Sequence, residues 1–318
     1  MVNLMTNFTN RNIKFIKFEI QNSIIMKKKL CFCVALLSSM CFSIADAQIL
    51  YKVDGNGVKA PSYVFGSHHL SPIAVVEESG VMEYFNQTDQ VVGEIDLTID
   101  PMALSLALQP HMMAPADSTL SVLLTNEDME ALNAQFMKWS PMEGLQLSML
   151  EPMKPMAVST MVAAGMSNEA MPGYDPSQQL DTYFFKEGQA QGKKIMGLET
   201  PEYQGEVLFD MTPLTVQAEV LADMLKNPEE SIQAAKKLAE AYKNRDLNAM
   251  LELSKEDEEH PEFMEYILYK RNGEWMTKLP EIIKENPSFI VVGALHLGGP
   301  KGILEGLKSE GFTITPIY

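Results

Sequence analysis

Two histidines occur in the same short pattern near opposite ends of a chain of 318 residues that holds only five histidines. The first copy, YVFGSHHLSP, contains Gly66 and His69, and the second, IVVGALHLGGP, contains Gly293 and His296. In each copy an apolar run, which predicts a strand, leads into G-x-x-H-L and then into a turn with glycine or proline. A single G-x-x-H arises often by chance, but the doubled pattern indicates two strands that end in similar loops.

The position of these histidines suggests a shared site. Ligands of α/β sheets collect at the carboxyl ends of the strands, so two such strands lying side by side would bring His69 and His296 together. In the alignment of the two copies His68 matches Leu295, a position that points to the other side of a strand. We therefore expect His69 to be the functional histidine and His68 to be an accessory group or a packed strand-end residue.

Two glutamates follow predicted strands in the same way. Glu94 lies in QVVGEIDL, a predicted strand from Val91 to Leu97, and Glu199 ends the predicted strand KKIMGLE. A carboxylate among apolar neighbours must be paired, protonated or bound to a cation. Two histidines and two glutamates at strand ends form a donor set for a divalent metal. Taken alone, each glutamate could also be an ordinary solvated acid at the end of a strand.

A basic residue follows the aromatic helix face FMEYILYKRN. Arg271 could hold Glu94 or Glu199, or clamp a carbonyl or carboxylate of a substrate. The alternative is a solvated basic helix end. His111 and His260 are expected to be surface or loop residues.

The start of the chain carries a secretory pattern. Lys27 to Lys29 form a positive segment, Leu30 to Ile44 are largely apolar, and Ala45-Asp46-Ala47 is a small-x-small cleavage site before Gln48. We predict a signal peptide over residues 26–47 and export to the periplasm or the exterior, without a transmembrane helix in the mature chain. A retained membrane anchor is the alternative. Residues 1–25 are interpreted as an extension ahead of the true start at Met26.

Composition excludes several kinds of function. The net charge is −17, and removal of the lysine-rich leader makes the chain more acidic still, which argues against nucleic-acid binding. All three cysteines (Cys31, Cys33 and Cys41) lie in the predicted leader. The mature chain therefore has no disulfide, thiolate ligand or cysteine nucleophile, and a transition metal must be held by His, Asp or Glu.

The order of the predicted elements indicates an α/β fold. Residues 49–66 read as a β-hairpin, and later strands alternate with helices, which is typical of α/β units. Residues 48–318 are expected to form one domain with a helical insertion at about residues 100–170. That insertion holds twelve methionines, from Met102 to Met171. Flexible thioethers that fill a core or line a groove explain them better than a copper site does.

These motifs together resemble the TraB/GumN family, which includes the Tiki metalloproteases. The similarity rests on the paired G-x-x-H motifs, the strand-end glutamate, GYD, GLET, RN and the closing VVGALHLGGPKGILEGLKSEGFTITPI, and it covers nearly all of residues 48–318. It implies an α/β fold with mixed sheets built from two related halves, each with a strand ending in G-x-x-H. It also implies hydrolysis of a peptide or protein substrate that depends on a divalent metal, Mn²⁺ or Co²⁺.

The resemblance assigns roles by position. The implied metal ligands are His69, Glu94 and His296, the motif glycines are Gly66 and Gly293, the catalytic residues are Glu199, Arg271 and Asn272, and the accessory residues are His68 and Asp175. Our hypothesis is a metal-activated water, with Glu199 as general base or as support for the ligands, and Arg271 stabilising the oxyanion. The alternatives are a catalytically silent protein of the same fold that binds a peptide, haem or small ligand, and a structural envelope protein.

Overall fold

The computed structural model describes residues 48–69, 71–140, 142–171, 173, 175, 178–255 and 264–318. The predicted signal peptide, the extension before it, the three cysteines, Tyr174 of the GYD motif and His260 lie outside the described residues. In the ranges above, no helix is long and apolar enough to cross a membrane.

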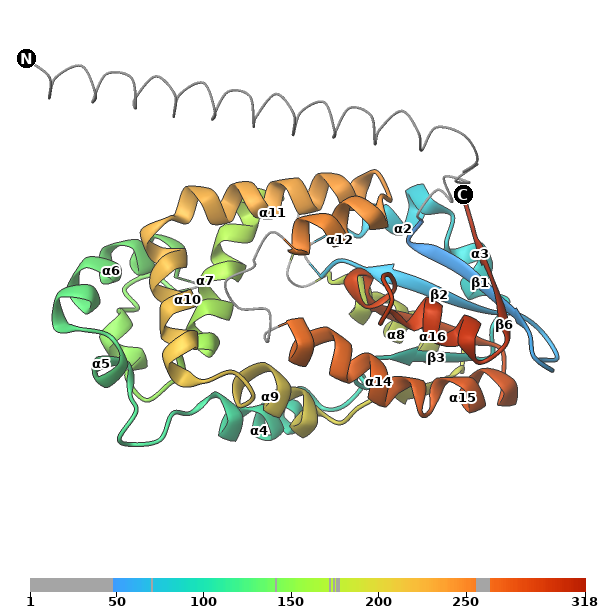
Figure 1. The fold of residues 1–318 in the computed structure, drawn as a ribbon, viewed down its shortest axis with the longest axis horizontal. Helices are drawn as coiled ribbons and strands as arrows, with labels where there is room; N and C mark the ends of the chain where they lie inside the picture. Colours follow the sequence, from blue (N-terminus) through green and yellow to red (C-terminus); the bar gives the residue numbers. More distant parts are fainter. Residues whose placement is uncertain are drawn as a thin grey trace, which may run out of the picture. The chain divides into compact units, whose positions relative to one another are not determined.

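Six strands of the described chain form one mixed sheet in the order β4-β3-β5-β2-β1-β6. The strands are β1 (Leu50–Gly55), β2 (Ser62–Ser67), β3 (Gln90–Gly93), β4 (Lys194–Gly197), β5 (Ser288–Gly293) and β6 (Phe312–Pro316). β4, β3, β5 and β2 run parallel, whereas β1 is antiparallel to both β2 and β6. The α/β class with a mixed sheet is therefore confirmed, and so is the β1–β2 hairpin (Figure 1). That the fold is built from two related halves stays a prediction.

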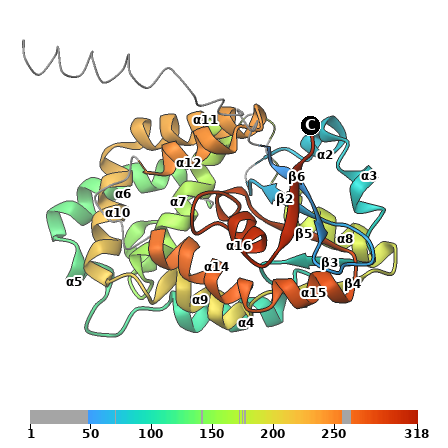
Figure 2. The same ribbon diagram turned by 45° about the vertical axis from the view of Figure 1, so that its right-hand side comes forward.

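Helices cover both faces of this sheet. One face packs against α2 (Ala74–Ser79), α3 (Met82–Phe85) and α8 (Leu180–Ala190), and the other against α14 (Arg271–Met276), α15 (Leu279–Glu285) and α16 (Ile303–Ser309) (Figure 2). Alternate strand residues enter opposite cores because strand side chains have a period of two. Phe289 and Val291 of β5 join the first core, and Ile290 and Val292 join the second.

A third core is entirely helical. It is built mainly by α5 (Leu120–Leu123), α6 (Asn126–Trp139), α7 (Pro155–Ala170), α10 (Leu214–Lys226) and α11 (Pro228–Lys243), with the 3₁₀ turn η1 (Leu147–Leu150). The other α-helices of the described residues are α4 (Pro101–Met112), α9 (Pro201–Phe209) and α12 (Leu247–Lys255). Of the methionines in this part of the chain, Met166 and Met171 are buried, whereas Met102, Met142 and Met149 are 64–68% exposed. Core filling thus explains the two buried methionines and not the three exposed ones.

One predicted boundary is wrong, and two helical segments are interrupted. The strand expected from Val91 to Leu97 ends at Gly93, so Glu94 is the first residue after β3. The segment from residue 265 to 285 is not one regular helix, because a π-helix, η2 (Glu265–Lys270), precedes α14 and a break separates α14 from α15. A further helical break, at residues 244–246, separates α11 from α12.

His111 is a helical residue and not a loop residue, and its side chain is 22% exposed. It lies in the last turn of α4, where its Nδ1 is 2.5 Å from Oδ2 of Asp210, and Lys154 also contacts that carboxylate. Its ring packs against Gly205, where an added Cβ would lie only 2.7 Å from the imidazole. The pair joins α4 to the end of α9, and sequence spacing gave no sign of a partner so distant in the chain.

Candidate functional site

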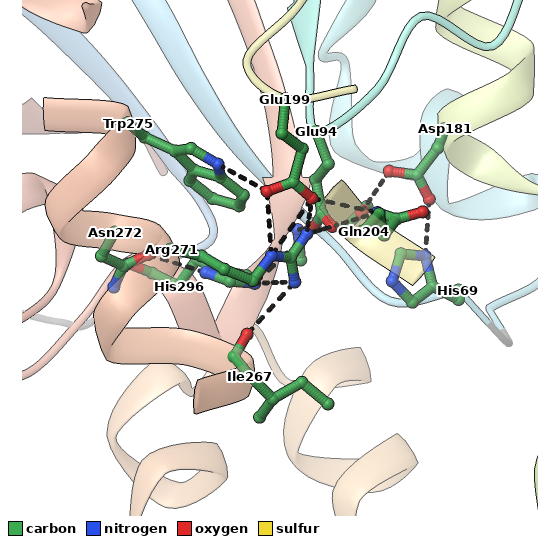
Figure 3. Close-up of polar contacts among 12 residues, drawn as sticks. His69, Glu94, Asp181, Glu199, Gln204, Ile267, Arg271, Asn272, Trp275 and His296 are labelled. Atoms are coloured by element: carbon green, nitrogen blue, oxygen red, sulfur yellow. Dashed lines mark hydrogen bonds and ion pairs between the residues drawn. The ribbon is translucent and has the colours of Figure 1, made fainter. Parts of the chain in front are cut away.

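Four parallel strands end at one edge of the sheet, and a predicted site residue follows each of them. His69 follows β2, Glu94 follows β3, Glu199 follows β4 and His296 lies in the 3₁₀ turn η3 (Ala294–His296) after β5. The registers align the strand ends, since Ser67 pairs with Gly293 and Gly93 pairs with Gly197. The structure therefore brings these side chains to a common region (Figure 3).

Arg271 connects the two glutamates. Its Nη2 lies 2.5 Å from Oε2 of Glu94 and 2.5 Å from Oε1 of Glu199, and its Nε lies 3.2 Å from both Glu199 oxygens (Figure 3). Nη1 donates to the carbonyl of Ile267 at 3.1 Å, within the wider turn of the π-helix that precedes Arg271. The side chain is buried, with 3% of the residue exposed, so the reading as a solvated helix end is wrong.

His296 is held in one orientation by Asn272. Its Nδ1 lies 2.7 Å from Oδ1 of Asn272, whose Nδ2 donates to the carbonyls of His296 and Lys301. Because the amide nitrogen is used on those carbonyls, Oδ1 accepts from Nδ1–H, and Nε2 keeps its lone pair. Burial lowers the pKa of His296 to about 3, so the ring is neutral at pH 7. Trp275 packs on the ring, with centroids 4.4 Å apart.

His69 is held by Asp181, a residue that the sequence did not suggest. Nδ1 of His69 lies 2.9 Å from Oδ2 of Asp181, whose Oδ1 accepts from Ser67 Oγ at 2.7 Å. The charge of Asp181 raises the pKa of His69 to about 9. The His69 side chain is 60% exposed, however, so solvent weakens this attraction. The available signal was an acid on the buried face of α8, which it shares with Phe184 and Phe185.

Glu94 is ionised in spite of its burial. Burial by itself would raise its pKa, but the charge of Arg271, together with His296, His69 and the N–H of Gly293, lowers the pKa below its usual range. That N–H donates to Oε1 at 2.9 Å, and Gln204 donates to Oε2 at 3.4 Å. Oε1 is thus the oxygen of Glu94 that faces the histidines.

Glu199 is enclosed by hydrogen-bond donors. Besides Arg271, it accepts from Trp275 Nε1 at 3.1 Å and from Gln204 Nε2 at 3.2 Å, and its side chain is 3% exposed. A carboxylate engaged in this way has no oxygen directed at a substrate. The geometry favours Glu199 as the support of Arg271 over Glu199 as a general base. Trp275 and Gln204 are further site residues that the sequence reasoning missed.

The donor set fits a divalent cation in part. Oε1 of Glu94 and Nε2 of His296 are 3.7 Å apart, too far for a hydrogen bond but suitable for two ligands that each lie ~2.0–2.2 Å from one metal. A Cβ added to Gly293 would lie 3.4 Å from Glu94 Oε1, 3.4 Å from His296 Cδ2 and 3.9 Å from His69 Nε2, so all three groups border one point.

Two observations limit that fit. Nη1 of Arg271 lies 3.3 Å from Nε2 of His296, so the lone pair of Nε2 accepts a hydrogen bond from Arg271 and is not free for a metal. In the part of the chain that the structure describes, no three His, Cys, Asp or Glu side chains are grouped closely enough to hold a metal ion. The pair of Glu94 and His296 is therefore in place, while the set of three with His69 is not assembled.

The accessory residues and the first motif glycine lie as follows. His68 packs against the ring of Tyr242 at 5.3 Å, its buried Nδ1 has no hydrogen-bond partner among the residues that the structure describes, and burial lowers its pKa to about 4. Asp175 accepts from Gln178 and is not among the described residues that line the site cavity. Gly66 permits close packing, since an added Cβ would lie 2.9 Å from Cα of Ala294.

The model of the TraB/PrgY/gumN family matches residues 49–316. This match spans most of the chain, which therefore belongs to the TraB/PrgY/gumN family, as the sequence motifs predicted. Comparisons with curated proteins and with solved structures found no significant match.

Proposed function

We propose that this protein is a hydrolase that cleaves peptide bonds with the help of a divalent metal. The observation that carries the proposal is the pair of Glu94 Oε1 and His296 Nε2, 3.7 Å apart, with His69 Nε2 bordering the same point beside Gly293 at the ends of three parallel strands. Asn272 and Asp181 bind the Nδ1 atoms of the two histidines and so direct each Nε2 away from themselves. Such an outer hydrogen bond is typical of metal-binding histidines.

Each residue has a stated role in this proposal. Glu94, His296 and His69 would hold the metal, which by resemblance to the family is Mn²⁺ or Co²⁺. When bound, such a metal polarises a scissile carbonyl and lowers the pKa of a water molecule. Arg271, whose N–H groups already bind Glu94, Glu199 and the carbonyl of Ile267, would hold Glu94 in position as a ligand and would not bind the carbonyl oxygen of a substrate directly. Glu199 and Trp275 keep the guanidinium in position.

The contacts of Arg271 also support a second candidate. Its guanidinium satisfies Glu94 and Glu199 and contacts Nε2 of His296, so the cluster is stable as it stands. A catalytically silent protein of the same fold would keep this arrangement and use the adjoining cavity to bind a peptide, haem or another small ligand. In both cases we propose that the protein is exported, periplasmic or secreted, on the strength of the leader pattern in the sequence.

Elemental analysis and a peptide digest separate the candidates. The full chain is stripped with a chelator, reloaded with Mn²⁺ and dialysed, and bound metal is measured before a peptide library is digested and read by mass spectrometry. The hydrolase predicts stoichiometric metal and cleavage, both lost in His69→Ala and largely kept in His68→Ala, its neighbour and control. Ligand binding without metal or cleavage supports the silent candidate. If no metal binds and His69→Ala and His296→Ala change nothing measurable, the proposal is wrong.

A further inference from the structure

The charged cluster forms only one wall of a cavity of about 600 Å³. This volume is within the range of ~300–1,000 Å³ that is typical of sites for small organic ligands. The rest of the lining is largely apolar and forms a second wall, which comes mainly from helical segments. Its principal residues are Leu208, Leu238, Met250, Met264, Ile267 and Leu295.

The polar and apolar walls adjoin each other along two helical segments. On α9, Gln204 donates to Glu94 and Glu199, and Leu208 lines the cavity one turn further on. In the same way Ile267 lines the cavity one turn before Arg271, and Figure 3 shows both on one segment, with the guanidinium directed to the glutamates. A ligand can therefore place a polar bond at the cluster and an apolar group against the helices at the same time.

The charges on the polar wall are already matched by partners. Arg271 is paired with Glu94 and Glu199, and His69 is paired with Asp181. No other Lys or Arg is found among the described residues that line the cavity. A carboxylate or phosphate on a ligand would lose its bound water and find no free cation in the protein, so its desolvation free energy would not be offset. An uncharged apolar group has no such desolvation cost.

The apolar wall suits more than one side-chain shape. Leu208 and Leu238 are half-buried and so present a part of their surface to the cavity. Met250 and Met264 add unbranched, flexible thioethers, which adapt to ligands of different outline. The wall thus favours large apolar groups in general over one particular shape.

From these contacts we propose that the cavity selects peptides with a bulky, uncharged aliphatic or aromatic side chain beside the bond held at the charged cluster. This inference rests on the proposed function for the identity of the ligand as a peptide. The apolar wall selects the side chain, and the matched charges reject acidic side chains and free carboxylates.

Binding measured without hydrolysis tests this selectivity. Fluorescein-labelled peptides, blocked at the carboxyl terminus and identical except for Leu, Phe, Ala or Asp at one central position, are titrated with the full-length His296→Ala chain and read by fluorescence polarisation. We expect the Leu and Phe peptides to bind about 10- to 100-fold more tightly than the Ala peptide, and the Asp peptide to bind more weakly still. Equal affinities, or tighter binding of the Asp peptide, would overturn the inference.

Substitutions in the apolar wall locate the selectivity. In the same background, Leu208→Asp and Leu238→Asp should each abolish the preference for Leu over Ala, while Val122→Asp, a matched change at a residue 63% exposed, should leave it intact. Leu208→Trp fills the cavity without adding charge and should weaken binding of the Phe peptide more than binding of the Ala peptide. This variant replaces the aspartate variants if they fail to fold. Selectivity that survives Leu208→Asp, Leu238→Asp and Leu208→Trp contradicts the assignment.

The two proposals fail in different ways. Preferential binding of Leu and Phe peptides to a wild-type chain that cleaves none of them would reject the hydrolase and keep the cavity assignment. Metal-dependent cleavage that does not depend on the neighbouring side chain would keep the hydrolase and reject the cavity assignment. Cleavage of small apolar esters with no binding of any peptide would overturn the peptide as the occupant.

Discussion

Nδ1 of His69 lies 2.9 Å from Oδ2 of Asp181, across 112 positions of the chain. Asp181 is also fixed by Ser67, so β2 supplies both the histidine that follows it and the hydroxyl that orients its partner. This pair keeps Nε2 of His69 on the side of the ring away from the carboxylate, where it borders the same point as Glu94 and His296.

Asp181→Asn should weaken metal binding with little loss of stability. The amide retains the size of the carboxylate and can still accept from Ser67, but the charge that orients His69 is lost. We expect Mn²⁺ affinity to fall about 10- to 100-fold, measured by isothermal titration. Asp117→Asn, the same change at an exposed loop residue, is the control. Unchanged affinity in Asp181→Asn would remove His69 from the ligand set.

The two motif glycines should respond differently to alanine. At Gly293 the added methyl group would make only ordinary contacts of 3.4 Å or more, but it would occupy the point that the three polar groups border. At Gly66 it would lie 2.9 Å from the backbone of Ala294. Gly293→Ala should therefore keep its melting temperature and lose metal binding, whereas Gly66→Ala should melt at a lower temperature. The reverse pattern would show that Gly293 serves packing alone.

Arg271→Ala should destabilise the fold. It leaves Glu94 and Glu199 buried with no cation between them, at a cost of about 3–5 kcal/mol in the free energy of unfolding. The melting temperature should fall by on the order of 10 °C in thermal unfolding followed by circular dichroism. Lys270→Ala, at the exposed position next to it, should change stability little. If the two variants melt alike, the glutamates are stabilised by something other than Arg271.

His68→Phe should reduce the sensitivity of the chelator-treated protein to acid. Burial lowers the pKa of His68 from 6.5 to about 4, so between these pH values the unfolded chain binds a proton that the native chain does not. As the pH is lowered through this window, the free energy of unfolding therefore decreases, by up to about 1.4 kcal/mol per pH unit. Phenylalanine removes this contribution and keeps the packing on Tyr242.

Urea unfolding at pH 7 and pH 5 measures the effect. At pH 7 the variant should be at least as stable as the wild type, because the Nδ1 that it lacks has no hydrogen-bond partner in the described part of the chain. Some acid sensitivity should remain, since burial lowers the pKa of His296 in the same direction. Identical pH dependence in the variant and the wild type would contradict this account of His68.

The parts of the fold that the sequence predicts well are those set by local pattern. Apolar runs and glycines located β2 and β5, and the doubled G-x-x-H placed His69 and His296 at strand ends that turn out to be neighbours. The boundary of β3 was less predictable, because the apolar alternation continues through Ile95 after the strand hydrogen bonds stop at Gly93.

The parts that escaped prediction depend on contacts between distant segments. Asp181 meets His69 only because α8 packs on the sheet, and Asp210 meets His111 only because α9 lies along α4. Likewise, the sequence allowed Arg271 to pair with either glutamate, and only the π-helix before it and the adjacent ends of β3 and β4 place it between both.

Titration of the chelator-treated full chain with Mn²⁺, followed calorimetrically and by elemental analysis, tests the central claim most directly. The proposed metal-dependent hydrolase predicts one tightly bound Mn²⁺ per wild-type chain and none in His296→Ala, in which a principal ligand is missing while Arg271 keeps its glutamates. Absence of stoichiometric binding in the wild type, or equal binding in His296→Ala, would contradict it.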